Sequence, residues 1–418
     1  MKAAITKKLL FVILVMLTIS FNSQSQTSVI WARQLGTDKE EYVHNHLVDK
    51  DGNIYISGNT LGIMNNQNYG KTDGFITKID SLGNTNWSRQ FGSAEDEDIQ
   101  WSAIDSKGNI YITGFTKGVL NTKNYGKEDI FVIKYSPDGR KDWTKQIGSD
   151  STDQAFNIFI DKKDFIYITG STSGKLGESI FGSQDAFIMK LDDKGNIIFT
   201  HQFGTNDRDG CSSITGDYSG NIYVCGSTFS NLGGVNKGFM DGFIGKFTNS
   251  GVLIKITQFG SEGFDMATTI LVDNDKSIYV GGTTSGDFSS QQSGEGDCFL
   301  SKFSPEGDIL WSNQFGTPKH DGVKGLAFNP KSSENILVSG LLNLPPAQAF
   351  IRMYKKDGSL VWEKNLLTEG DAKDASGKDI SLDNKGNIYQ IGLTASGLFG
   401  SLIGVTDFYV IKLKADNL

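Results

Sequence analysis

The chain of 418 residues is poor in the residue types that mark several common classes of protein. Its 3 cysteines, Cys211, Cys225 and Cys298, are too few for a scaffold held together by disulfides. Its 6 prolines exclude a proline-rich linker, whereas 50 scattered glycines favour many tight turns. No sustained apolar period of 3.6 residues appears after residue 30, so we expect almost no helix.

The chain also lacks an excess of positive charge. Its formal net charge is −8, and the few basic residues before residue 26 make the remainder more acidic still. Such a chain is a poor candidate for holding nucleic acid through phosphate contacts, and anionic lipid would repel it. We therefore expect neither nucleic acid nor a membrane surface as a partner.

Residues 1–25 have the three-part pattern of a secretory signal peptide. A short basic region precedes an apolar run over 9–17, and polar residues follow. The run is shorter than the roughly 20 residues that span a membrane. Small residues Ser23 and Ser25 suit cleavage after Ser25, and no cysteine stands there for a lipid anchor. A retained anchor is the alternative. We expect one domain over 26–418 in an exported protein, periplasmic or secreted, with no membrane insertion after cleavage.

A repeat of 56 residues fills the rest of the chain. Its marker is a glutamine followed by an apolar residue and a glycine, at Gln34, Gln90, Gln146, Gln202, Gln258 and Gln314. A seventh, shortened unit has Asn365 at this place. Self-similarity at such a period is typical of architectures in which each unit is one supersecondary element.

Each unit contains four short β-rich segments separated by Gly, Asn and Asp. In the first complete unit they are 42–48, 54–57, 75–79 and 87–91, with an Asp-x-x-Gly turn at Asp49 between the first two. Four strands per repeated unit predict a β-propeller, and seven turns of this type predict seven blades.

The two ends of the repeat region predict how the ring closes. Segment 29–35 is equivalent to a fourth strand, and segment 408–413 to a third strand. Pairing them would build one blade from both ends of the chain and remove two open edges. An open solenoid is the alternative, but the offset between the chain ends and the blade boundaries favours the closed ring.

The units resemble the bacterial SBBP-type repeats, which are named for seven-bladed propellers. The resemblance rests on the pattern Asp-Gly-Asn-Ile-Tyr and on a strand with Trp-x-x-Gln-(Phe/Leu)-Gly, and it covers about residues 31–413. Units six and seven depart most from the pattern. The resemblance implies an all-β propeller with four-stranded blades that is exported or surface-associated, and it implies no particular activity.

An acidic residue recurs at the entrance to each first strand, at Glu41, Glu97, Asp153, Asp209, Asp265 and Asp321. A ring of carboxylates would attract or bind a cation at one face. Alternatively, each carboxylate accepts hydrogen bonds from backbone amides in its own loop. A residue found once per blade is better explained by what every blade needs, so we favour the second interpretation.

Candidate ligand contacts are sought where one unit departs from the others. His44 and His46 alternate along the first strand of the first blade, so we expect them to share a face. At the position of His46, five other units have Ile or Leu. Trp101 replaces small or polar residues, and Lys324 follows a histidine and an aspartate. First strands line the channel of a propeller, so these four residues are candidates at the channel mouth. Alternatively, His46 is a hydrogen-bonded core residue and Trp101 fills a gap between blades.

No catalytic pattern emerges from the sequence. There is no Gly-x-Ser-x-Gly segment, no cysteine lies near a histidine, and no third ligand joins the histidine pair. We assign no catalytic residue, no metal ligand and no cofactor. Cys211 and Cys225 could pair across a hairpin, but we favour small buried residues because their equivalents are small.

The favoured function is an exported, non-enzymatic binding or scaffold module for a protein or glycan partner, because regular repeats leave no room for an inserted catalytic segment. The alternative is a propeller enzyme or a quinone-binding protein. The turn over 80–87 is loosely similar to the tryptophan-docking motif of quinoprotein propellers. A third hypothesis is a structural spacer or assembly subunit.

Overall fold

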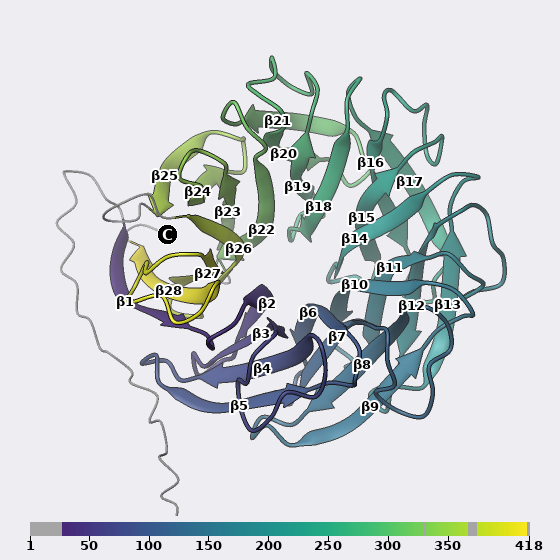
Figure 1. The fold of residues 1–418 in the computed structure, drawn as a ribbon. Coiled ribbons are helices and arrows are strands. Elements are labelled where there is room, and N and C mark those ends of the chain that lie inside the picture. Colours follow the sequence, from purple (N-terminus) through teal and green to yellow (C-terminus); the bar gives the residue numbers. More distant parts are fainter. Residues whose placement is uncertain (1–26, 330–331, 367–373, 416–418) are drawn as a thin grey trace, which may run out of the picture.

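The computed structural model describes residues 27–329, 332–366 and 374–415. These residues form seven four-stranded antiparallel sheets arranged around a central axis (Figure 1). The predicted all-β fold with seven blades is confirmed. Within these residues no helix has the length and apolar character needed to cross a membrane. The predicted signal peptide lies outside the described residues.

Each blade runs from an inner strand beside the axis to an outer strand at the rim. The inner strands are β2 (Glu41–Val48), β6 (Glu97–Ile104), β10 (Asp153–Ile160), β14 (Asp209–Gly216), β18 (Asp265–Val272), β22 (Gly322–Asn329) and β26 (Ala375–Leu382). The second strands are β3 (Ile54–Thr60), β7 (Ile110–Thr116), β11 (Ile166–Thr172), β15 (Ile222–Thr228), β19 (Ile278–Thr284), β23 (Ser332–Leu342) and β27 (Asn387–Thr394).

The outer half of each blade completes the sheet. The third strands are β4 (Asp73–Ile79), β8 (Asp129–Tyr135), β12 (Asp185–Leu191), β16 (Asp241–Phe247), β20 (Asp297–Phe303), β24 (Gln348–Lys355) and β28 (Asp407–Ala415). The outer strands are β5 (Thr85–Phe91), β9 (Lys141–Ile147), β13 (Ile197–Phe203), β17 (Leu253–Phe259), β21 (Ile309–Phe315), β25 (Leu360–Leu366) and β1 (Thr27–Leu35).

The ring closes as the sequence predicts, through the strand at the beginning of the described chain. β1 pairs antiparallel with β28, so the seventh blade has the order β1-β28-β27-β26. β1 also contacts the first blade, because Trp31 Nε1 donates to the Ser81 carbonyl at 3.1 Å and Arg33 Nε donates to the Gly83 carbonyl at 3.0 Å. One strand thus joins the last blade to the first.

The recurring Asp-x-x-Gly turn is a hydrogen-bonded structural unit. In the second blade, Asp105 accepts the N–H groups of Lys107 and Asn109 at 2.9 and 2.8 Å. Its other oxygen accepts the Asn109 side-chain amide at 2.8 Å and the Tyr111 hydroxyl at 3.1 Å. Gly108 has φ of 82°, a conformation that favours glycine. The turn therefore needs Asp, Gly and Asn at these places for its own geometry.

The core lies between blades. One cluster joins Tyr55, Ile76 and Phe91 of the first blade to Ile110 and Phe131 of the second, and six further clusters repeat the arrangement around the ring. A single repeat cannot bury its apolar faces alone, so neighbouring blades stabilise one another.

The three cysteines are free and buried, which confirms the favoured interpretation of small core residues. In the β14–β15 ladder Cys211 lies opposite Gly226, and Cys225 lies opposite Ser213. Burial raises the pKa of the Cys211 thiol to about 12, so this side chain stays protonated near neutral pH.

Candidate functional site

A β-bulge interrupts every inner strand at the same position. In β2 the register shifts between Val43 and Asn45, so His44 has no partner in β3. The residues left unpaired by the seven bulges are His44, Gln100, Phe156, Ser212, Thr268, Lys324 and Lys378. Their side chains are half-buried, whereas Val43 and Asn45 on either side of the first bulge are buried. The bulges therefore place one side chain per blade on the channel wall.

Trp101 lies farther along the channel. A cavity of about 260 Å³ is lined by residues of all seven inner strands, among them Leu47, Trp101, Asn157 and Asp379. Trp101 also packs against the apolar cluster between the second and third blades. It therefore occupies the predicted channel position and also fills a gap between blades.

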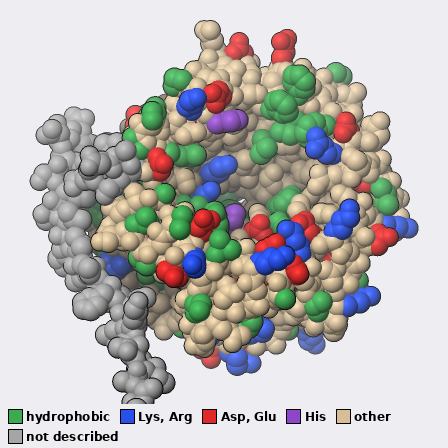
Figure 2. Space-filling model, viewed as in Figure 1, with side chains coloured by type: hydrophobic (Ala, Val, Ile, Leu, Met, Phe, Trp, Pro, Cys, Tyr) green, Lys and Arg blue, Asp and Glu red, His purple; other side chains and the backbone are tan. Residues whose placement is uncertain are grey.

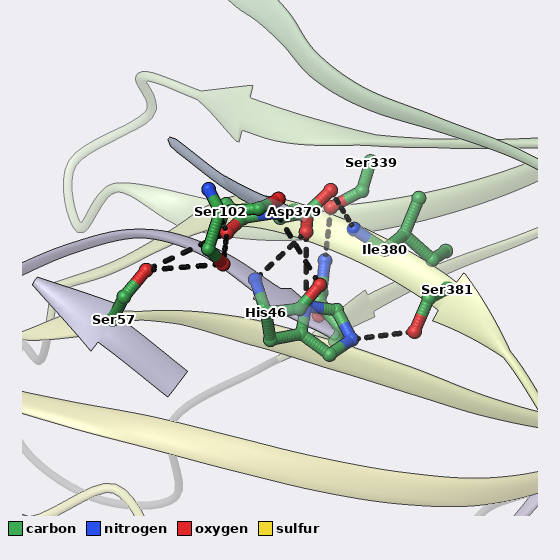
Figure 3. A network of polar contacts seen from close by, with 9 residues as sticks. His46, Ser57, Ser102, Ser339, Asp379, Ile380 and Ser381 are labelled. Carbon is green, nitrogen blue, oxygen red and sulfur yellow. Dashed lines mark hydrogen bonds and ion pairs between the residues drawn. The ribbon is translucent and has the colours of Figure 1, made fainter. Parts of the chain in front are cut away.

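The structure separates His44 from His46. His44 Nε2 lies 3.9 Å from Asp98 Oδ1 on β6, and the His44 side chain is 32% exposed. His46 is buried on the other side of β2, with Nδ1 3.0 Å from Asp379 Oδ2 and Nε2 2.6 Å from Ser381 Oγ, both on β26 (Figure 3). The prediction that the two rings share a face is wrong, because the bulge adds one residue and breaks the alternation of the strand.

The polar residue that replaces Ile or Leu in the second blade, Ser102, belongs to the same buried joint. Asn45 Oδ1 accepts the Ser102 N–H at 2.9 Å and also the Ser102 hydroxyl. Ser57 Oγ lies 3.3 Å from Ser102 Oγ, as Figure 3 shows. Asp379 additionally accepts the His46 N–H at 3.1 Å. These groups link blades seven, one and two. His46 is therefore a hydrogen-bonded core residue, which was the alternative to a ligand contact at the channel mouth.

Lys324 belongs to a basic group that sequence reasoning missed in part. Lys324, Lys378 and His44 occupy the bulges of three adjacent blades, and we name them the channel basic group. Burial, together with the charges of Lys378 and Lys324, lowers the pKa of His44 to about 4. Burial lowers the pKa of Lys324, and burial with the Lys324 charge lowers that of Lys378. Lys378 was not singled out, although the alignment that places Ile380 opposite His46 also places Lys378 opposite His44.

The recurring carboxylates are structural. Glu97 Oε2 accepts the Ser93 N–H at 2.7 Å, and Oε1 accepts the Thr116 hydroxyl at 2.8 Å. Loop amides bond the equivalent carboxylates in the same way. In each of these carboxylates at least one oxygen accepts a loop amide. Nowhere in the described ranges do three or more His, Cys, Asp or Glu side chains gather so as to hold a metal. The interpretation as acceptors of backbone amides is confirmed.

The turn that is similar to a tryptophan-docking motif acts as a joint between blades. Asp80 accepts the N–H groups of Leu82 and Asn84 within the turn, at 2.9 and 2.8 Å. The Ser81 carbonyl accepts the Trp31 indole from the preceding blade. Its recurrence therefore follows from blade packing.

A second candidate site lies beside the loop between β15 and β16, and of its residues the sequence analysis singled out only Lys324. Phe239 and Phe264 stack with ring centroids 5.2 Å apart and an interplanar angle of 9°, although 69% and 48% of their surfaces are exposed. They line a cavity of about 1000 Å³ that shares Phe264 and Ser285 with a second cavity of about 700 Å³, lined also by Met266 and Lys324. We call the two together the aromatic cleft.

The aromatic cleft departs from the repeat pattern. At positions equivalent to Phe239, Lys71 and Glu295 form ion pairs with Glu95 and Lys319, at 2.6 and 3.1 Å. Phe239 takes this place in the fourth blade. Phe264 stands one residue past the position of Glu95 and Lys319, in the loop before β18 of the fifth blade. The two phenylalanines can be read from the sequence, but only the structure shows that the loops that carry them meet at the surface.

Comparisons with known proteins agree with this fold. The SBBP family model, described as a beta-propeller repeat, matches residues 30–63, 86–121, 142–178 and 198–233. Regulatory protein FlaEY of Caulobacter vibrioides is 24% identical over 42% of this chain. An uncharacterised WD repeat-containing protein of Acanthamoeba polyphaga mimivirus is 22% identical over 68% of it. The alignments span 19% and 28% of these relatives, so the chain matches less than a third of either.

Solved structures show the same architecture. The Pan2 WD40 domain of Neurospora crassa has a TM-score of 0.54 at 10% identity, and the alignment covers 90% of each chain. An ulvan lyase of polysaccharide lyase family PL25 has a TM-score of 0.51 at 14% identity, covering 86% of this chain and 93% of the lyase. These similarities concern the fold alone. The chain is therefore a seven-bladed β-propeller in which four segments match the SBBP-type repeat.

Proposed function

We propose that this chain is an exported, non-enzymatic binding module that holds a protein partner in the aromatic cleft. The observation that carries the proposal is the exposed Phe239–Phe264 stack, in which Phe239 stands where the first and fifth blades have the ion-paired residues Lys71 and Glu295. Exposed contiguous apolar surface on a folded protein commonly marks an interaction site.

The composition of the cleft favours a protein over a glycan. Val235 and Met266 extend the apolar surface beside the two rings, with 78% and 44% of their surfaces exposed. Polar residues surround this centre, namely Asn236, Lys237, Ser261, Glu262, Asp287 and Gln292. An apolar centre with aromatic residues and a polar rim is the usual composition of a protein–protein interface. A glycan is the other class that the test must separate.

Replacing both rings should abolish partner capture. We expect the double variant Phe239→Ser/Phe264→Ser to lose a protein retained by the wild-type chain from a native envelope extract, and to bind the purified partner at least tenfold more weakly. Truncating a central aromatic contact commonly costs about 2 kcal/mol or more. Ile254→Ser is the matched control, because Ile254 is 50% exposed at the far end of β17.

Binding of neutral and acidic oligosaccharides to the wild-type chain and to the double variant should be measured in the same way. Equal retention of the partner by the double variant would place the interface elsewhere. Binding of an oligosaccharide that depends on the two rings would assign the cleft to a glycan instead.

Export carries its own prediction. Cleavage after Ser25 should give a secreted or periplasmic protein whose first residue is Gln26. Mass spectrometry of the amino-terminal peptide, from the envelope fraction and from the medium, measures this directly. A protein that retains Met1 and stays in the cytoplasm would contradict export.

A further inference from the structure

Two lysines of the channel basic group differ in their contacts from the lysines that recur in the repeats. Lys324 on β22 and Lys378 on β26 occupy the bulges of neighbouring inner strands. Across the described ranges, no carboxylate forms an ion pair with either ammonium group. These two cations are therefore half-buried side by side without a protein counter-charge.

The ammonium groups of the lysines that recur in the repeats each contact an aromatic ring and a backbone carbonyl. In the first blade, Lys78 Nζ lies 4.9 Å from the centre of the Tyr55 ring and donates to the Pro137 carbonyl at 3.3 Å. The same two contacts recur at Lys134, Lys190, Lys246, Lys302 and Lys412. No such ring or carbonyl contact is seen at Lys324 or Lys378 in the part of the chain that the structure describes.

The carboxylates around the channel basic group have other partners. Glu295 and Asp321 line the same cavity as Lys324, but Glu295 pairs with Lys319 at 3.1 Å and Asp321 accepts the Thr317 hydroxyl at 3.0 Å. Asp98, which lies 3.9 Å from His44, accepts the Asn59 amide at 2.7 Å. Asp379 is held by His46. In a chain with 48 acidic residues, two adjacent unpaired lysines are unexpected, because desolvation and mutual repulsion both disfavour their charged forms.

There is also space beside Lys324. Lys324 lines the cavity of about 700 Å³ that forms part of the aromatic cleft. Figure 2 shows the centre of the ring hollowed on this face, with Lys or Arg atoms and His atoms on the wall of the hollow. A small ligand that enters the hollow would meet the two ammonium groups.

We propose that Lys324 and Lys378 bind an oxyanion group in the channel, namely a carboxylate, sulfate or phosphate, with the His44 imidazole on the adjoining blade. An oxyanion would neutralise both ammonium groups and accept charge-assisted hydrogen bonds from them. It could be a free inorganic ion or a substituent of a larger molecule such as a sugar acid. This site adjoins the aromatic cleft, because Lys324 lines its second cavity. Neither lysine is part of the Phe239–Phe264 stack, so different variants test the two proposals.

Calorimetric titration of the full chain tests this site. Sodium sulfate, sodium phosphate and sodium glucuronate are titrated separately at constant ionic strength. We expect saturable binding of at least one probe, and at least tenfold weaker binding in Lys324→Gln/Lys378→Gln. Ser212→Ala is the matched control, because Ser212 occupies the equivalent bulge in the fourth blade. Binding of sulfate or phosphate would identify an inorganic ion, whereas preference for glucuronate would identify a sugar acid.

Thermal unfolding of the same variants distinguishes a ligand site from a structural role. Without added anion, the double glutamine variant should be as stable as the wild type or more stable, because it removes repulsion. Only the wild type and Ser212→Ala should gain melting temperature when the bound anion is added. The proposal is overturned if no probe binds saturably, if the double variant binds equally well, or if it melts below the wild type.

Discussion

A chain that starts at residue 36 should fail to form the closed ring, because it lacks the whole of β1. That strand pairs with β28 from Thr27 opposite Ala415 to Leu35 opposite Phe408. Its loss would expose the edge of a strand whose Phe408, Tyr409 and Val410 are buried. It would also remove the contacts of Trp31 and Arg33 with the first blade. We expect a loss comparable to the full stability of a typical domain, about 5–15 kcal/mol.

Size-exclusion chromatography and thermal unfolding measure this effect. The truncated chain should elute as aggregates or show no cooperative transition, since an exposed edge strand also invites intermolecular pairing. Removal of residues 1–25, the predicted signal peptide, is the matched control and should leave the melting temperature unchanged. A monomeric truncated chain that unfolds at the wild-type temperature would show that the ring does not depend on β1.

Replacing His46 by alanine should destabilise the fold by about 3 kcal/mol, because a buried polar group that loses its partner costs about 1–3 kcal/mol and a charged group costs more. His46 is 2% exposed and Asp379 is 6% exposed. The substitution removes the ring that lies 3.0 Å from the Asp379 carboxylate and 2.6 Å from the Ser381 hydroxyl. The free energy of unfolding, measured with urea, should fall accordingly.

Two further variants make the His46 prediction specific. His44→Ala should change stability by no more than about 0.5 kcal/mol, because His44 is partly exposed and its distance to Asp98 is 3.9 Å. The double variant His46→Ala/Asp379→Ala should recover part of the loss, because it removes the unpaired carboxylate. If His44→Ala and His46→Ala lowered the free energy of unfolding equally, the conclusion that only His46 has a structural role in the core would be refuted.

Much of the candidate site depended on features that a regular repeat does not reveal. The alternation rule placed His44 and His46 on one face, but the bulge between Val43 and Asn45 sends the rings toward different blades. Lys324 was noticed as an exception to the pattern. Lys378 was not, although it stands in the same repeat position as His44 and Lys324, because the sequence does not show that this position is a bulge. A bulge has no reliable signature in one sequence, since hydrogen bonds to the neighbouring strand fix its position.

By itself, the sequence determined the blade count, the strand order and the closure of the ring. The physical reason is that these features depend on local contacts. In each unit the Asp-x-x-Gly turn and the buried aromatic residues repeat the same hydrogen bonds and apolar contacts, at a regular spacing along the chain. Only the tertiary structure decided which exceptional residues meet. His46 joins Asp379 across 333 residues, Phe239 stacks on Phe264 between two blades, and Lys324 and Lys378 lie on adjacent inner strands. Such meetings depend on how seven blades are arranged around one axis, which sets distances between residues far apart in the chain.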